Sequence, residues 1–136
     1  MSDDAPLILV ADDESHIVHV VTLKLQNAGY RVITAEDGEE ALALALEHRP
    51  NLVITDFQMP FMSGLELCTQ LKSDERTAET PALMLTARGF SLGRDVLEQT
   101  NIAAVLSKPF SPRDVLARVQ ELLGGRSSST VALQVP

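Results

Sequence analysis

Five short, largely apolar runs recur along this chain and leave few folds open to it. The runs cover residues 7–11, 31–34, 52–55, 82–85 and 103–106. Longer segments separate them, and in these segments apolar residues recur at helical spacing. Strands that are apolar on both faces and alternate with helices are typical of a parallel sheet covered on both sides. The sequence therefore predicts an α/β fold built from five βα units.

Several of the intervening segments also carry signals for where a helix begins or ends. Asp37 and Ser63 are each followed three residues later by glutamate, the pattern of a capping box. The segment over about residues 91–99 is a weaker helix candidate, because Gly89 and Gly93 lie beside or within it and glycine lowers helix stability. The expected helices cover about 15–28, closed by Gly29; Asp37 to just before Pro50; a segment from Ser63 onward; about 91–99, beside Gly89 and Gly93; and a last segment from Ser111-Pro112, closed by Gly124-Gly125.

Length and composition place these elements in one domain. A chain of 136 residues with 45% hydrophobic side chains fits one globular domain and excludes two of full size. We expect an N-terminal extension over 1–6, the domain over 7–123 and a short flexible tail over 124–136. The single cysteine, Cys68, cannot form an internal disulfide, which fits a reducing compartment. The chain has neither a membrane-length apolar run nor a signal-peptide pattern, and we therefore expect a cytoplasmic protein without membrane insertion.

The charge balance limits the partners of such a domain. Eleven Lys and Arg against nineteen Asp and Glu give a formal net charge of -8. A surface this negative repels nucleic-acid phosphate, so we expect no direct contact with nucleic acid. It suits cations or a protein partner with a basic face.

Polar residues with useful chemistry follow four of the five runs. These residues are Asp12-Asp13, Asp56, Thr86 and Lys108. In open parallel sheets, ligands bind beyond the carboxyl ends of the strands. Three crowded carboxylates require a cation if all are to stay ionised. Few ligands, all of them oxygens, favour Mg²⁺ completed by waters and a phosphate. A lysine and a hydroxyl beside the ion predict a phosphoryl pocket, in which an aspartate can act as nucleophile.

Each of these residues taken alone has a simpler explanation. An aspartate pair after a strand is usually a turn or a helix cap, and Asp56 alone would be a turn residue. Thr86 alone would be a strand-end hydroxyl, and Lys108 a solvated charge. Their joint occurrence, at the ends of different predicted strands, is what favours a site.

Several motifs taken together resemble one known family. The chain resembles the receiver domain of two-component response regulators in Asp12-Asp13-Glu14, Asp56-Phe57-Gln58-Met59-Pro60 with Gly64, Thr86-Ala87, and Lys108-Pro109-Phe110. The resemblance covers about residues 7–123. It implies a single doubly wound (βα)₅ domain with a five-stranded parallel sheet, of the CheY-like and flavodoxin-like type.

The resemblance also implies a phosphoacceptor and a metal site. Asp56 would accept a phosphoryl group from a phosphohistidine donor, which would be a histidine kinase or a histidine phosphotransfer protein. Asp13 would bind Mg²⁺ directly and Asp12 mainly through water. Asp56 and the backbone carbonyl of Gln58 would complete the protein's share of the ligands.

Further matching residues would act on the phosphoryl group itself. Thr86 would bond a phosphoryl oxygen and draw its loop inward, and Lys108 would pair with the phosphoryl group. Ala87 is small enough to leave room for that group. The resemblance also implies a cis peptide between Lys108 and Pro109, and an X-Pro bond is the one place where this isomer has a low energetic cost.

One position departs from the family pattern. Val105 stands where members commonly carry Tyr or Phe, an aromatic side chain that moves inward as the threonine loop moves. Valine lacks that reach, so we expect the output face to change less or by another route. Gly89 and Gly93 mark the neighbouring segment as the mobile element. Gln58 and Arg88 occupy the positions that tune the lifetime of the phosphorylated state in the family, although both can also be solvated loop residues.

These features predict a stand-alone response regulator receiver. It would catalyse its own phosphorylation and dephosphorylation with Mg²⁺ and would turn over no external substrate. Its output would go through protein contacts on the fourth helix, fifth strand and fifth helix, or it would act as a carrier in a phosphorelay.

Two alternatives come from other classes. A phosphatase of the haloacid dehalogenase type would place Asp-x-Asp after the first strand, where this chain has Asp12-Asp13-Glu14. A receiver-like interaction scaffold with vestigial phosphorylation would not need the complete set of site residues, although Val105 favours it mildly.

Overall fold

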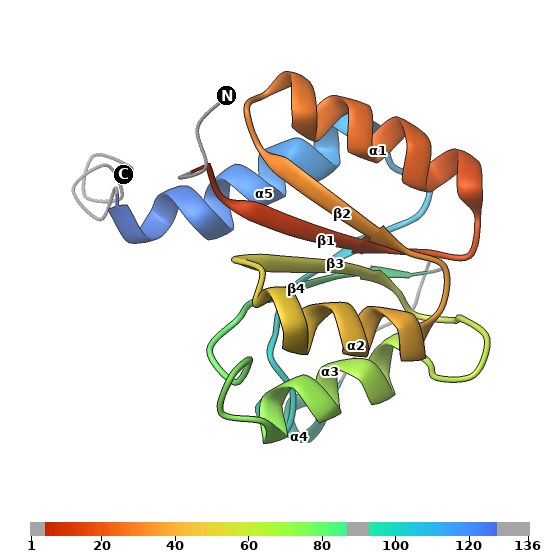
Figure 1. Ribbon diagram of the computed structural model, residues 1–136, viewed down its shortest axis with the longest axis vertical. Helices are drawn as coiled ribbons and strands as arrows, with labels where there is room; N and C mark the ends of the chain where they lie inside the picture. The colour runs from red at the N-terminus through yellow and green to blue at the C-terminus, as the bar shows by residue number, and fades with distance from the viewer. Residues whose placement is uncertain (1–4, 87–92, 128–136) are drawn as a thin grey trace.

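Five parallel strands form one sheet in the computed structural model, which describes residues 5–86 and 93–127 (Figure 1). The strand order is β2-β1-β3-β4-β5, so the chain winds outward in both directions from β1 and β3. This confirms the predicted doubly wound (βα)₅ architecture. The strands are β1 (Leu7–Ala11), β2 (Arg31–Ala35), β3 (Leu52–Asp56), β4 (Ala82–Thr86) and β5 (Ile102–Ser107).

Helices cover both faces of this sheet. In Figure 1, α1 and α5 lie on one face, and α2, α3 and α4 lie on the other. None of the helices within residues 5–86 and 93–127 combines the length and the apolar character that crossing a membrane requires. The helices are α1 (Ser15–Asn27), α2 (Gly38–His48), α3 (Gly64–Ser73), α4 (Arg94–Glu98) and α5 (Pro112–Ser127).

The two faces of the sheet make two separate cores. Successive side chains of a strand point to opposite faces, so Ile8 and Val10 pack toward α1 and α5 while Leu9 packs toward α2 and α3. Strands β3 and β4 are buried along their whole length, as the continuous apolar runs predict. Cys68 is fully buried in the second of these cores, so it is a core residue.

The predicted capping residues open their helices. The Ser63 hydroxyl accepts from the Glu66 amide at 3.1 Å, and the Glu66 carboxylate accepts from the Ser63 amide at 2.9 Å, a complete capping box. Asp37 accepts from the Glu40 amide at 2.8 Å. The Glu40 carboxylate bonds the amide of the residue before Asp37, however, so this box is displaced by one residue.

Two helix boundaries differ from the prediction. The prediction for α4 was about 91–99, of which residues 91 and 92 lie outside the described residues. The helix spans Arg94–Glu98, and it begins after Gly93 because this glycine takes an extended conformation as the N-cap. Helix α5 does not end at Gly124-Gly125 but continues to Ser127. A glycine ends a helix when its backbone turns left-handed, and the backbone of α5 stays helical through both glycines.

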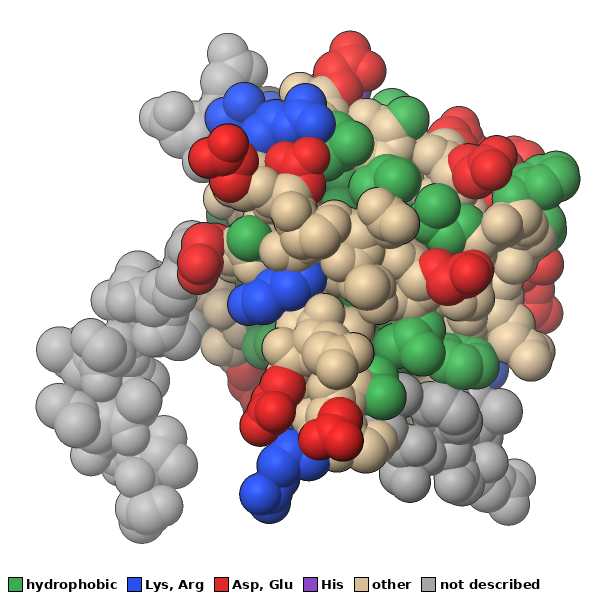
Figure 2. All heavy atoms as spheres, turned by 90° about the horizontal axis from the view of Figure 1, so that it is seen from below, with side chains coloured by type: hydrophobic (Ala, Val, Ile, Leu, Met, Phe, Trp, Pro, Cys, Tyr) green, Lys and Arg blue, Asp and Glu red, His purple; other side chains and the backbone are tan. Residues whose placement is uncertain are grey.

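The side of the molecule on which α3 and α4 lie carries acidic side chains and fewer basic ones (Figure 2). Figure 2 shows acidic side chains spread over this face, with hydrophobic side chains in small separate groups between them. This distribution agrees with the formal net charge of -8.

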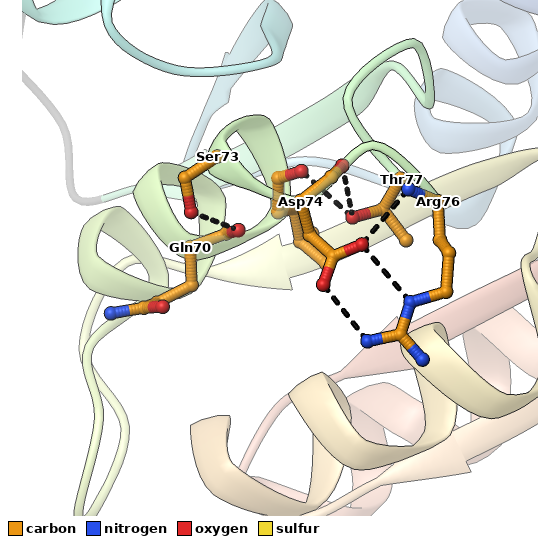
Figure 3. A network of polar contacts seen from close by, with 6 residues as sticks. Gln70, Ser73, Asp74, Arg76 and Thr77 are labelled. Atoms are coloured by element: carbon orange, nitrogen blue, oxygen red, sulfur yellow. Dashed lines mark hydrogen bonds and ion pairs between the residues drawn. The ribbon is translucent and has the colours of Figure 1, made fainter.

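A compact network of polar contacts lies at the end of α3 and in the segment that connects it to β4 (Figure 3). The guanidinium of Arg76 donates two hydrogen bonds to the Asp74 carboxylate, at 3.0 and 2.9 Å. The hydroxyl of Thr77 is buried and donates to the carbonyl of Leu71 at 2.7 Å. The Leu71 carbonyl, at the end of α3, also accepts from the Asp74 amide at 3.4 Å, so the Thr77 hydroxyl is the closer of its two donors.

Replacing Thr77 by valine is expected to lower the free energy of unfolding by about 1 kcal/mol, because the Leu71 carbonyl loses the shorter of its two hydrogen bonds and keeps only that from the Asp74 amide. Urea denaturation measures the change. Thr69→Val is the matched control, since the Thr69 hydroxyl also donates to a helix carbonyl but is exposed to water. Equal losses in the two variants would show that the buried hydrogen bond is not the cause.

Candidate active site

Four strands bring polar residues to one edge of the sheet. Asp12 follows β1 directly, Asp56 is the last residue of β3 and Thr86 is the last residue of β4. Lys108 follows β5, and its amide donates to the Thr86 carbonyl at 2.7 Å. The parallel direction of the strands thus collects, at one place, residues that lie up to 96 positions apart in the sequence.

Three carboxylates form the centre of this site. Asp12, Asp13 and Asp56 each offer an oxygen, and these oxygens all lie within 4.8 Å of one another. Asp12 is fully buried and Asp56 is 7% exposed, whereas Asp13 is exposed. The Oδ1 atom of Asp12 accepts from the Glu14 amide at 2.9 Å, but its buried Oδ2 atom has no hydrogen-bond partner among the described residues. An unpartnered acceptor within a carboxylate cluster suits a bound cation.

Burial makes ionisation of two of these carboxylates, Asp12 and Asp56, costly. For Asp12, burial is the largest effect and raises its pKa to about 6, against the hydrogen bond from the Glu14 amide, which lowers it. Burial also raises the pKa of Asp56, and the positive charge of Lys108 opposes this shift. The site therefore holds negative charge that burial disfavours and that a cation would stabilise.

Lys108 supplies a cationic side chain next to the cluster. Its Nζ atom lies 3.2 Å from Asp56 Oδ1 and 3.3 Å from Glu14 Oε1. Burial by itself would lower the pKa of Lys108, but the charge of Asp56 and the contacts with the two carboxylates raise it above the ordinary value. The amine therefore stays protonated. The peptide bond to Pro109 is cis, as the resemblance implied.

Close packing of the β3–α3 loop fixes the position of Asp56. The Phe57 amide donates to the Leu85 carbonyl at 2.9 Å, and the Gly64 amide donates to the Phe57 carbonyl at 2.8 Å. A Cβ atom at Gly64 would lie 2.1 Å from the backbone oxygen of Asp56. Only glycine fits at this position without a shift of the loop or of the strand.

The other predicted site residues differ in how the structure places them. Gln58 is exposed in the β3–α3 loop, and Pro109 is exposed beside Lys108. Val105 is half-buried in β5, pairs with Met84 and packs against the core on the α2 and α3 side. Ala87 and Arg88, together with the predicted mobile Gly89, lie outside the described residues.

The sequence prediction assigned no separate role to Glu14. The only sequence signal for such a role is that Glu14 directly follows the aspartate pair. The contact with Lys108, 94 residues away, depends on the order of the strands.

The fold and site together define a class of protein. It is a doubly wound α/β domain with an acidic cluster and a lysine at the carboxyl edge of its sheet. Residues 8–120 match the family model described as the response regulator receiver domain. The chain therefore belongs to this family of two-component signalling proteins, whose members accept phosphoryl groups from histidine kinases and bind Mg²⁺ at an acidic site.

Individual relatives agree with this assignment. The chain is 41% identical over 116 residues to the alkaline phosphatase synthesis transcriptional regulatory protein PhoP of Bacillus subtilis, covering 85% of this chain and 48% of PhoP. It is similar in structure to the chemotaxis response regulator CheY4 of Vibrio cholerae, with a TM-score of 0.80, 35% identity and coverage of 87% and 98% of the two chains. The chain spans about half the length of the curated relatives it matches.

A further structural relative holds a metal ion. The receiver domain of the sensor histidine kinase PA1611 of Pseudomonas aeruginosa has magnesium coordinated in its active site cleft. The TM-score is 0.78 at 25% identity, over 88% of this chain and 98% of that one.

Proposed function

We propose that this chain is a phosphorylation-dependent signalling module whose phosphoacceptor is Asp56. The observation that carries the proposal is the position of Asp56, almost buried at the end of β3, 3.2 Å from Lys108 and within the carboxylate cluster. The donor would be the phosphohistidine of a histidine kinase or of a phosphotransfer protein. The module would catalyse only its own phosphorylation and dephosphorylation.

The acidic cluster fits the divalent cation that this chemistry requires. Two observations support a cation site: the Oδ2 atom of Asp12 has no hydrogen-bond partner within residues 5–86 and 93–127, and the three aspartates are crowded together. Asp13 and Asp56 would hold Mg²⁺ directly, Asp12 through water, and Gln58 through its carbonyl. When bound, the ion neutralises charge on the transferring phosphoryl group.

The chain's own residues then account for the transfer. A carboxylate oxygen of Asp56 attacks phosphorus, the bond from phosphorus to the donor nitrogen breaks, and the imidazole nitrogen keeps the electron pair. Lys108, which the neighbouring carboxylates keep protonated, pairs with the phosphoryl oxygens. Thr86 would donate its hydroxyl to one of them. Attack by water on phosphorus later restores Asp56 and releases inorganic phosphate.

We propose that residues 7–123 form the receiver unit and that its output goes through protein contacts. The net charge of -8 supports a protein partner rather than nucleic acid. A stand-alone role needs its own test, because the relatives are about twice as long. An immunoblot of the native protein at the size of this chain would support that role, and a product about twice as large would contradict it.

Intact mass after incubation with acetyl phosphate tests the proposed chemistry. We expect a gain of one phosphoryl group that requires Mg²⁺ and is absent in Asp56→Asn. Asp95→Asn removes an exposed carboxylate from α4 and should leave the gain unchanged. If the folded protein binds Mg²⁺ but gains no phosphoryl group, the chain is instead a scaffold that has lost phosphorylation.

A further inference from the structure

One charged side chain outside the predicted set of site residues reaches the reacting edge of the sheet. The Oε1 atom of Glu14 lies 3.3 Å from Lys108 Nζ, and the same nitrogen lies 3.2 Å from Asp56 Oδ1. The Glu14 side chain is 48% exposed, whereas that of Asp56 is 10% exposed. Two carboxylates therefore share one ammonium group, one on the water side and one on the buried side.

The main chain fixes Glu14 in this position. Its amide donates to Asp12 Oδ1 at 2.9 Å, and its carbonyl accepts from the amides of Ile17 and Val18 at 3.0 and 3.2 Å. Glu14 is the N-cap residue of α1 and has an extended backbone. The side chain therefore reaches Lys108 from a helix start that is bonded on both sides.

Helix stability does not explain a glutamate at this position. N-cap positions favour Ser, Thr, Asp and Asn, whose short side chains accept hydrogen bonds from the first turn. The Glu14 side chain makes no capping hydrogen bond and contacts Lys108 instead. Its carboxylate is thus directed to the site and not to the helix.

We propose that Glu14 is a positioning residue that restrains Lys108 and slows phosphoryl transfer to Asp56. This rests on Asp56 being the phosphoacceptor. In the transfer from acetyl phosphate, an Asp56 oxygen bonds to phosphorus as the bond from phosphorus to the acetate oxygen breaks, and acetate leaves with the electron pair. Lys108 has to give up its contact with Glu14 to pair fully with the phosphoryl oxygens.

Phosphorylation rates of Glu14→Gln and Glu14→Asp test the proposal. Glutamine keeps the length and removes the charge, whereas aspartate keeps the charge but is one methylene shorter and loses the contact. Because exposed ion pairs are modest in strength, we expect both variants to react with acetyl phosphate about two- to fivefold faster than wild type. Calorimetric titration sets a saturating Mg²⁺ concentration for each variant, so that metal occupancy does not account for the difference.

Two controls isolate the contact. Glu79→Gln removes the same charge from the exposed loop before β4 and should leave the rate unchanged. In a Lys108→Ala background, Glu14→Gln should have no further effect on the residual rate, because the lysine that Glu14 restrains is gone. A merely structural role of Glu14 would persist in that background.

Each result decides the matter. Faster reaction of both variants, lost in the Lys108→Ala background, supports the restraint. Acceleration by Gln alone shows a general charge effect and overturns it, as do unchanged or slower rates in both. If wild type gains a phosphoryl group but the rates are equal, only the inference on Glu14 fails. If wild type gains none, the proposed function fails with it.

Discussion

Replacing Gly64 by alanine is expected to cost about 3 kcal/mol of unfolding free energy, because overpacking of this kind forces the surrounding backbone to move. The added Cβ would lie 2.1 Å from the backbone oxygen of Asp56 and 3.1 Å from its carbonyl carbon and from the Thr55 hydroxyl oxygen. The first neighbour is main chain and cannot rotate away. Relief therefore requires a shift of the end of β3 or of the start of α3.

This shift of the backbone would also impair phosphorylation and Mg²⁺ binding. Asp56 would move relative to Asp12, Asp13 and Lys108, so protein that still folds should take up phosphoryl groups far more slowly and bind Mg²⁺ more weakly. Urea denaturation, intact mass and calorimetry measure the three effects.

Gly93→Ala is the matched control for this substitution. Among the described residues, no heavy atom outside the chain neighbours of Gly93 lies within 4 Å of the site of its Cβ, and its backbone has negative φ. We expect a change within about 1 kcal/mol, the size of an N-cap effect. If Gly64→Ala behaved like Gly93→Ala, the loop would be less tightly packed against β3 than the structure indicates.

Replacing Asp12 by asparagine is expected to stabilise the metal-free protein at pH 7.5 and to remove most of its response to Mg²⁺. Asp12 is fully buried, and burial raises its pKa from 3.8 to about 6. Ionising this carboxyl in the folded state therefore costs on the order of 2–3 kcal/mol in the absence of a cation. A neutral amide of the same shape avoids this cost.

The pH dependence follows from the direction of the shift. Between about pH 4 and pH 6 the folded state holds a proton on Asp12 that the unfolded chain has already lost, so stability falls as pH rises through this window. The raised pKa of Asp56 acts in the same direction. In EDTA, wild type should thus be more stable at pH 5 than at pH 7.5, and Asp12→Asn should show a smaller difference.

Mg²⁺ should restore the stability of wild type near neutral pH. An ion at one hundred times its dissociation constant contributes about 2.7 kcal/mol to a protein that binds it only when folded. Urea denaturation measures the free energy of unfolding under all four conditions, at pH 5 and 7.5, each in EDTA and in Mg²⁺. Asp95→Asn is the control, since that carboxylate is exposed on α4. Equal stability of metal-free wild type at the two pH values would contradict the assigned cost of burying Asp12.

The order of the elements, and the edge of the sheet at which the chemistry takes place, could be predicted from the amino-acid sequence. Short, continuous apolar runs predict strands that are buried on both faces, because the pattern of apolar side chains is a local property of the chain. The residues that follow those runs then had to meet, since parallel strands place their carboxyl ends at one edge. Capping patterns located the starts of α2 and α3 for the same local reason.

Tertiary structure decided the features that depend on close approach between distant segments. The contact of Glu14 with Lys108 follows from strand order and loop shape, and the need for glycine at position 64 follows from the backbone of Asp56. Helix α5 passes through Gly124 because a glycine weakens a helix without always ending it. That the Oδ2 atom of Asp12 has no hydrogen-bond partner in the described part of the chain likewise depends on which atoms surround it in the folded state, and no spacing along the chain encodes that arrangement.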